Sequence, residues 1–271
     1  MNKKLLLLIS LTVVIVAGML LTPSDESYAA VRYILNGVGL TLIPFIGAWI
    51  GLDAVKFFTF KSAFGKALFF ISLGVITYGL GTIVFFYYNM FLQTEIPYPC
   101  LGDIGFAATV ILANYGMFLL MKSIKMKFDA MTVAKLLILP IIIFAIVFPV
   151  FIYERAVEDA PLFTKFMNIY YVLGDVVFLS FALLILSISY GSILFRSVGV
   201  LSAGFILQAL ADFSFSYTAS AGTYYTSCWV DVLYCLAFFT IGYGMYFFLS
   251  RNRAAAAPAK PVTQATRKKT K

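Results

Sequence analysis

Histidine is absent from this chain, and cysteine and charged residues are scarce. Without histidine, the usual zinc-protease motif and most imidazole acid–base chemistry are excluded. No lysine lies in the last apolar segment, which argues against a retinal Schiff-base pigment of the usual kind. A Walker loop, a dinucleotide fingerprint and a Gly-x-Ser-x-Gly elbow are also missing. We therefore expect a protein that is not an enzyme and has no cofactor, and the sequence leaves any metal unknown.

Only 12% of the residues are charged, whereas 62% are hydrophobic. Soluble domains average about 25% charged and about 45–50% apolar residues, so a soluble fold could not bury this much apolar surface. The apolar runs approach the ~20 residues with which a helix crosses the ~30 Å hydrocarbon core of a bilayer. Runs such as Leu136–Ile152 and Val176–Ile188 do not alternate as barrel strands would. The predicted fold class is all-α, a polytopic transmembrane helical bundle with seven or eight helices.

Apolar segments separated by charged or Pro/Gly-rich breaks define the expected organisation. They cover about 5–22, 31–52, 67–90, 102–121, 135–153, 167–189, 197–215 and 229–249. The first segment is either a retained helix or a signal peptide, because Ser27-Tyr28-Ala29 resembles a small-residue cleavage site. We therefore divide the chain into residues 1–30, a seven-helix bundle over 31–250, and a disordered basic tail over 251–271.

Lysine and arginine predict the orientation of the chain, since they are enriched in cytoplasmic segments. With a cytoplasmic N-terminus, only Arg32, Arg155 and Lys165 of the 20 Lys and Arg residues lie outside. Removal of the first segment would leave the other seven in the same orientation. The C-terminus is therefore predicted to be cytoplasmic, in a multi-pass protein of the cell membrane.

The formal charge of +8 is concentrated in the predicted cytoplasmic segments and tail, so nucleic-acid binding need not be invoked. The tail, which ends in Thr-Arg-Lys-Lys-Thr-Lys, is too polar and too short to bury a core. Its basic residues are expected to be attracted to anionic headgroups or to act only as a topology anchor. The lipid bilayer is the expected partner.

The three cysteines are Cys100, Cys228 and Cys235. Cys100 and Cys228 precede apolar segments on the predicted outer side, where disulfides persist. A Cys100–Cys228 disulfide is one prediction, and two free apolar thiols are the alternative. Cys235 falls within the last apolar segment.

Four aspartates within or beside the apolar segments are candidate functional residues, because an ionisable group in a membrane helix is costly. Asp103 and Asp231 are expected near the outer ends of their helices, Asp212 about one turn inside, and Asp175 roughly two turns deep. All four would then lie in the outer half of the membrane. Grouped carboxylates would need a cation or shared protons between them.

Other polar residues share helix faces with these aspartates. They are Gln208 before Asp212, Asn168 and Tyr171 before Asp175, and Asn114 in the segment after Asp103. Together they predict a site for a small ligand, a cation or protons. The alternative is that each aspartate separately caps a helix or bonds a nearby Tyr or Asn, which fits best for Asp103 and Asp231.

Several short motifs resemble a seven-helix membrane sensor module found ahead of many bacterial and archaeal histidine kinases and diguanylate cyclases. The segment 96–103, Ile-Pro-Tyr-Pro-Cys-Leu-Gly-Asp, is similar to its "Tyr-Pro-Ser-x-Ala-Asp" helix entry, with Cys100 and Gly102 in place of Ser and Ala. Further similar segments follow in the same order: Phe128-Asp129-Ala130, Tyr170 to Asp175, Ala211-Asp212-Phe213, Gly222-Thr223-Tyr224 and Trp229-Val230-Asp231. The match spans about residues 65–250, and no kinase or cyclase domain follows it.

The resemblance implies a prokaryotic membrane sensor for signal transduction that acts through a separate cytoplasmic or membrane partner. Our leading hypothesis is a sensory module whose outer-half aspartates bind a small ligand or cation. A small cation- or proton-coupled transporter is the second hypothesis, and a structural or assembly subunit is the third. Inverted repeats and broken helices would favour transport, but the sequence has no clear internal repeat.

Overall fold

The computed structural model describes residues 2–124, 130–149, 160–192 and 194–256, and for 252–256 only the backbone. Every long element in these residues is an α-helix, which confirms the predicted all-α class. The helices are α1 Lys3–Leu21, α2 Ala29–Phe58, α3 Ala63–Tyr87, α4 Leu101–Ser123, α5 Ala130–Val147, α7 Leu162–Ser189, α8 Phe195–Ser220 and α9 Trp229–Ala256. A short 3₁₀ helix, η1 Glu26–Tyr28, precedes α2, and a short π-helix, η2 Tyr88–Leu92, follows α3.

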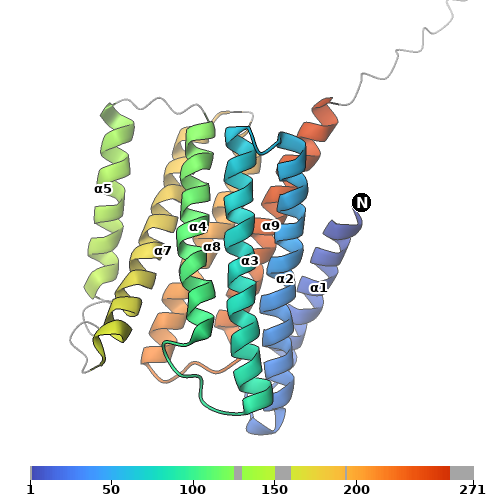
Figure 1. The fold of residues 1–271 in the computed structure, drawn as a ribbon, viewed down its shortest axis with the longest axis vertical. Helices are drawn as coiled ribbons and strands as arrows, with labels where there is room; N and C mark the ends of the chain where they lie inside the picture. Colours follow the sequence, from blue (N-terminus) through green and yellow to red (C-terminus); the bar gives the residue numbers. More distant parts are fainter. Residues whose placement is uncertain (1, 125–129, 150–159, 193, 257–271) are drawn as a thin grey trace, which may run out of the picture.

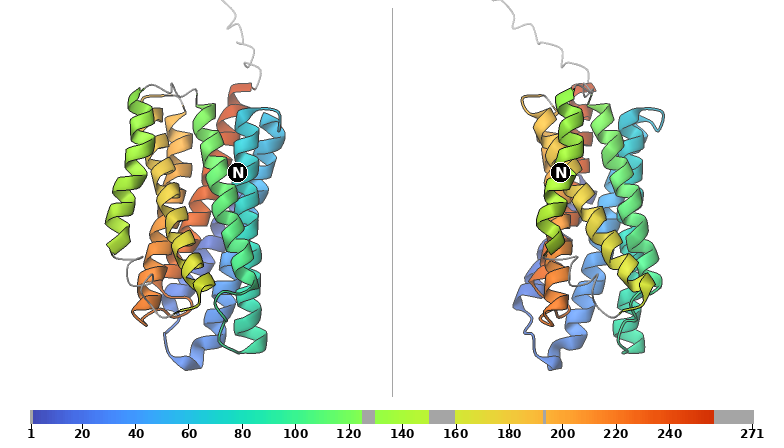
Figure 2. Two further views of the ribbon diagram at one scale, coloured as in Figure 1. Left: turned by 60° about the vertical axis from the view of Figure 1, so that its left-hand side comes forward. Right: turned by 90° about the vertical axis from the view of Figure 1, so that its left-hand side faces the viewer.

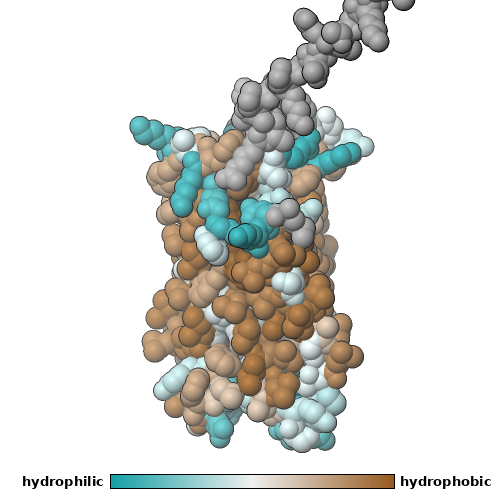
Figure 3. All heavy atoms as spheres, turned by 90° about the vertical axis from the view of Figure 1, so that its right-hand side faces the viewer, coloured by the Kyte–Doolittle hydropathy of each residue, from teal (hydrophilic) through white to brown (hydrophobic). Residues whose placement is uncertain are grey.

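Each of these eight helices is long and apolar enough to cross a membrane. Figure 3 shows a continuous hydrophobic zone around the middle of one face, with hydrophilic residues gathered at both ends. Large apolar side chains such as Val14 (65% exposed) and Ile141 (65% exposed) point outward, which water would oppose and lipid favours. The protein is therefore a multi-pass integral membrane protein.

The described helices run alternately in opposite directions along the chain, so the bundle has two distinct ends (Figure 1). We call the end with linkers 59–62 and 190–194 the tail end, because α9 finishes there. The end with linkers 22–28, 93–100 and 221–228 is called the loop end. α2, α3 and α9 pack side by side, α4 and α8 flank them, and α5 lies at the edge against α7 (Figures 1 and 2).

Small residues allow the central helices to approach closely. α2 and α9 cross at Gly47 and Gly242, where a Cβ on Gly242 would come within 2.8 Å of the Cα of Gly47. No larger residue could be accommodated at this point without separating the two backbones. This contact helps hold α9 against α2 along the centre of the bundle.

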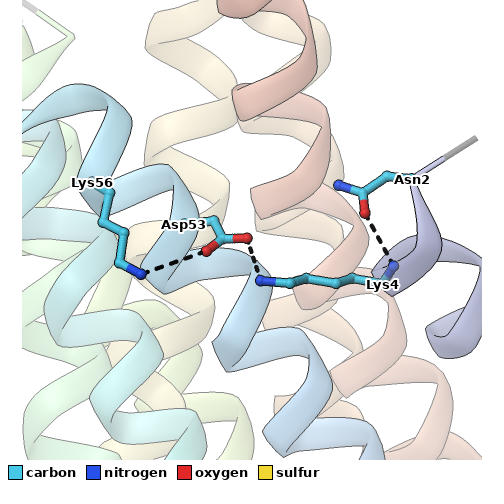
Figure 4. A network of polar contacts seen from close by, with 4 residues as sticks. All are labelled: Asn2, Lys4, Asp53 and Lys56. Atoms are coloured by element: carbon cyan, nitrogen blue, oxygen red, sulfur yellow. Dashed lines mark hydrogen bonds and ion pairs between the residues drawn. The ribbon is translucent and has the colours of Figure 1, made fainter.

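α1 is packed into the bundle as a helix. Leu8 and Ile15 are buried in the main core, and α1 contacts both α2 and α9. At the tail end, Lys4 forms an ion pair with Asp53 of α2, which also lies 4.0 Å from Lys56 (Figure 4). The Lys4 ammonium lies 3.9 Å from the centre of the Trp49 ring. These contacts place α1 against the centre of the bundle, beside α2 and α9.

The observed helix ends extend the predicted ones in several places. α7 begins at Leu162 rather than near residue 167, and α9 continues to Ala256 beyond the predicted end at 249. The tail residues 257–271 and most of the Phe128-Asp129-Ala130 motif lie outside the described residues.

Candidate functional site

Asp103 caps the start of α4. Its carboxylate accepts a hydrogen bond from the backbone N–H of Cys100 at 2.7 Å, and the sulfur of Cys100 accepts one from Gly102, which completes a capping box. The hydroxyl of Tyr171, on α7, donates to the other carboxylate oxygen at 2.9 Å. Asp103 is thus buried (4% exposed) with partners for both oxygens. It stabilises the helix start and joins α4 to α7.

More polar contacts join α4 and its preceding loop to α7. The Tyr98 hydroxyl donates to Asn168 at 2.7 Å, and the Tyr170 hydroxyl donates to the carbonyl oxygen of Ala107 at 2.8 Å. Deeper in the bundle, the amide of Asn114 donates to the carbonyl oxygen of Gly174 at 3.2 Å. The predicted residues Asn168, Tyr171 and Asn114 therefore all lie in the α4–α7 interface.

Asp231 has a similar local role at the start of α9. Its carboxylate accepts hydrogen bonds from the backbone N–H of Ser227 at 2.6 Å and from the Tyr224 hydroxyl at 3.2 Å, and Asn36 of α2 also bonds to it. The side chain is 1% exposed. Burial and the neighbouring Asp231 carboxylate raise the pKa of Tyr224 well above its ordinary value, so this hydroxyl keeps its proton.

Asp175 and Asp212 are the two aspartates that meet across helices. Asp175 stands near the midpoint of α7, deeper than the two turns predicted, because α7 begins earlier than expected. Its carboxyl group lies close to that of Asp212 on α8. Asp212 also accepts hydrogen bonds from Gln208 at 3.0 Å and from the Tyr234 hydroxyl of α9 at 2.6 Å. We call Asp175 and Asp212 the carboxyl pair.

The four predicted aspartates therefore do not form one cluster of mutual contacts. Asp103 and Asp231 are held at the starts of their own helices, and only the carboxyl pair brings two acids together. Among the described residues, no group of three or more His, Cys, Asp or Glu side chains is arranged to hold a metal ion.

The chemistry of the carboxyl pair suits the binding of a proton or a cation. Two ionised carboxylates repel and cannot hydrogen-bond to each other, because neither has a donor, so a proton or a cation between them would stabilise their close approach. Two further amide oxygens in the same region, Gln208 Oε1 and Asn114 Oδ1, are buried without a hydrogen-bond partner in the structure. Gln208 is 5% exposed, and its amide nitrogen already bonds to Asp212. The region thus offers unused oxygen acceptors beside a pair of acids.

All three cysteines are free in the structure, so the Cys100–Cys228 disulfide predicted as one alternative is not formed. Cys100 is engaged in capping α4, and Cys228 is buried in the core. Burial raises the pKa of both thiols above their ordinary value, which lowers the fraction of reactive thiolate.

Sequence reasoning did not identify Tyr234, Tyr224 or Arg32 as polar partners. Tyr234 of α9 bonds to Asp212 of α8, and Tyr224 bonds to Asp231 because the loop before α9 folds back onto that helix. Both contacts depend on the folded structure. Arg32 is buried (4% exposed), and it donates to the carbonyl oxygens of Pro23 and Asp25 while its own carbonyl accepts from Ser227. The position of Arg32, a charged residue near the start of an apolar segment, could have indicated from the sequence that it has polar partners.

Comparison with protein families, with curated proteins and with solved structures finds no match for this chain. The fold and the site define the class as a multi-pass helical membrane protein in which two acids, the buried Asp175 and the partly buried Asp212, lie close together.

Proposed function

We propose that this protein is a non-enzymatic sensory module of the cell membrane, in which the carboxyl pair binds a proton or a small cation. The single observation that supports this function is the contact between Asp175 and Asp212 across α7 and α8. The resemblance of the aspartate-containing motifs to the prokaryotic sensor module points in the same direction.

The energetic cost of placing an acid in a membrane helix is least offset for this pair. One aspartate in the middle of a membrane helix costs ~2.5–3.5 kcal/mol on insertion scales, and two in contact also repel when both are ionised. Asp103 recovers part of this cost by capping α4, and Asp231 does so through hydrogen bonds from Ser227 and Tyr224 in the loop before α9. Asp175, in the middle of α7, has no helix end to cap. A proton or cation bound between the two acids would remove their repulsion.

The position of the pair suggests how binding would be relayed. Asp175 lies on α7 and Asp212 on α8, and at the tail end α7 finishes at Ser189 and α8 begins at Phe195. Loss of the bound proton or cation would separate the two acids, and the separation would alter the packing of α7 against α8. The predicted orientation places the tail end in the cytoplasm, where a separate signalling partner would respond.

The test is a thermal-unfolding series on the purified protein from about pH 5 to about pH 8, with and without Na⁺, K⁺, Mg²⁺ or Ca²⁺. We expect the unfolding midpoint of the wild type to depend on pH or on one cation. Asp175→Asn should fold and lose this dependence, because asparagine keeps the shape and hydrogen bonding of aspartate without its charge. The matched control is Asp103→Asn, which removes a buried carboxylate that caps α4 and lies outside the carboxyl pair. This variant should unfold at a lower midpoint but keep the wild-type dependence of the midpoint on pH or cation.

Identical pH and cation profiles for the wild type and Asp175→Asn would contradict a sensing site at the pair. The second candidate function is cation- or proton-coupled transport, favoured by the unpartnered oxygens of Gln208 and Asn114, since hard cations prefer oxygen ligands. Proteoliposomes containing a trapped pH dye distinguish the two. Flux that is lost in Asp175→Asn would indicate transport, whereas an intact pH-dependent midpoint without flux would indicate sensing.

A further inference from the structure

An open surface cavity of about 270 Å³, most of whose lining residues are exposed, lies at the tail end, at the opposite end of α8 from Asp212. It is lined by Gly191 and Ser192 of the α7–α8 linker, Phe195 and Arg196 at the start of α8, and Arg251 of α9. Two arginines from different helices thus line one pocket. Its volume falls just below the ~300 Å³ at which pockets begin to hold drug-sized ligands, which suits a small polar group.

Three features make this cavity electropositive. The first is the pair of arginines, and within the described residues Arg196 forms no ion pair. The second is the N-terminus of α8, where Leu194 provides no side-chain cap and the N–H of Phe195 bonds to the carbonyl oxygen of Ser192. The positive end of the helix dipole lies here and adds to the charge of the arginines. The third is the tail end as a whole. Asp53 is the one acidic residue located there among the described residues, and it is already paired with Lys4 and Lys56.

The chemistry matches a phosphate group. A guanidinium presents parallel N–H donors that bind two phosphate oxygens, and the Ser192 hydroxyl and the start of α8 add further donors. Phe195 packs edge-on against Tyr190, with 5.5 Å between the ring centres, and Tyr190 is 80% exposed. Phe195 thus adds one aromatic ring to the cationic lining of the cavity, as expected where a phosphate headgroup meets its acyl chains.

We propose that this cavity is a binding site for a phosphate monoester or diester, supplied either by an anionic phospholipid headgroup or by a soluble phosphate compound. Arg196 and Arg251 hold the phosphate oxygens, and Arg251 is positioned by its contact with the Phe247 ring, 5.8 Å from the ring centre. The proposal does not depend on the carboxyl pair, since it uses none of those residues.

The test measures the unfolding midpoint of the full-length protein in lipid nanodiscs. One arm compares phosphatidylcholine nanodiscs with nanodiscs that also contain phosphatidylglycerol, and the other adds inorganic phosphate to phosphatidylcholine nanodiscs at constant ionic strength. We expect the midpoint to rise in at least one arm. A rise with phosphatidylglycerol only identifies a lipid headgroup, and a rise with inorganic phosphate shows that soluble phosphates also bind.

The variants distinguish a built site from a diffuse basic surface. Arg196→Gln should raise the anion concentration for a half-maximal shift about tenfold, the loss expected for one charge-assisted contact. Arg196→Lys keeps the charge but not the paired donors, so it should lose most of the response as well. Arg251→Gln should act in the same way as Arg196→Gln.

The matched control is Lys61→Gln, which removes an exposed tail-end charge from the α2–α3 linker and should respond to anions as the wild type does. Arg196 is exposed, so its replacement leaves the buried core intact. The proposal is overturned if the wild type shows no rise in either arm, if Arg196→Gln responds like the wild type, or if Lys61→Gln loses as much as Arg196→Gln.

Discussion

At the scale of single residues, Asp212 obtains its hydrogen bonds from two helices. Gln208 lies one turn earlier on α8, and the hydroxyl of Tyr234 reaches it from α9 at 2.6 Å. Tyr234 is itself buried (6% exposed), so the contact is shielded from solvent. Together with Asp175, these residues link α7, α8 and α9 through one carboxyl group.

We therefore predict that Tyr234→Phe destabilises the protein by about 1 kcal/mol, the typical strength of a hydrogen bond between membrane helices. The change removes one oxygen atom and leaves the ring in place. Thermal or denaturant unfolding of the detergent-solubilised protein measures the difference. The control is Tyr243→Phe on the same helix, a half-buried tyrosine that stacks on Phe239 and should tolerate the loss of its hydroxyl. Equal stability of Tyr234→Phe and the wild type would show that the hydrogen bond between Tyr234 and Asp212 does not stabilise the folded protein.

The aspartates could be predicted as polar residues in an apolar background, but their roles could not all be separated. Asp103 and Asp231 were expected to suit helix starts, and both have this role in the structure. The contact between Asp175 and Asp212 depends on how α7 and α8 are rotated and offset against each other. Neither quantity is encoded in the spacing of residues along one helix.

At the scale of helices, α1 is the element whose role the sequence left open. Its apolar run fits either a signal peptide or a retained helix, whereas its buried face and its contact with α2 and α9 are tertiary features. The ion pair between Lys4 and Asp53 lies at the tail end, where both side chains are about one-fifth exposed (20% and 22%). Partial exposure keeps the energy of such a pair at about 1 kcal/mol or less.

We predict that Asp53→Lys lowers the unfolding midpoint, because three lysines would then repel one another where α1 meets α2. The added change Lys4→Asp should restore part of the loss by re-forming the pair with reversed charges. Lys3→Asp in the Asp53→Lys background is the control, since Lys3 is exposed and adjacent but does not contact Asp53 in the structure. Equal recovery in both double variants would mean that overall charge, and not the specific pair, stabilises α1.

At the scale of the whole molecule, the distribution of charge between the two ends predicts the orientation in the membrane. The basic residues gathered at the tail end include Lys3, Lys4, Lys56, Lys61, Lys66, Lys122, Arg196 and Arg251. Because the described helices alternate in direction, one orientation of the bundle places all of them on the same side.

We predict that the tail end faces the cytoplasm. A fluorescent protein that matures only in the cytoplasm, fused after Lys271, should be active, and alkaline phosphatase at the same position should be inactive. Fusion of the same two reporters after residue 95, in the linker between η2 and α4, provides the reciprocal control. Phosphatase activity after Lys271 would reverse the orientation and would place the carboxyl pair nearer the cytoplasmic side.

The sequence by itself determined the membrane environment, the all-α class and the approximate helix positions, because hydropathy is a sum over neighbouring residues and needs no knowledge of packing. It also singled out Asp103, Asp175, Asp212 and Asp231, since an acid is conspicuous in an apolar run. Only the tertiary structure decided that Asp175 meets Asp212, that Tyr234 supports the pair, and that Arg196 and Arg251 line one cavity. Each of these contacts joins different helices, and their rotation and relative height are set by the packing of the whole bundle.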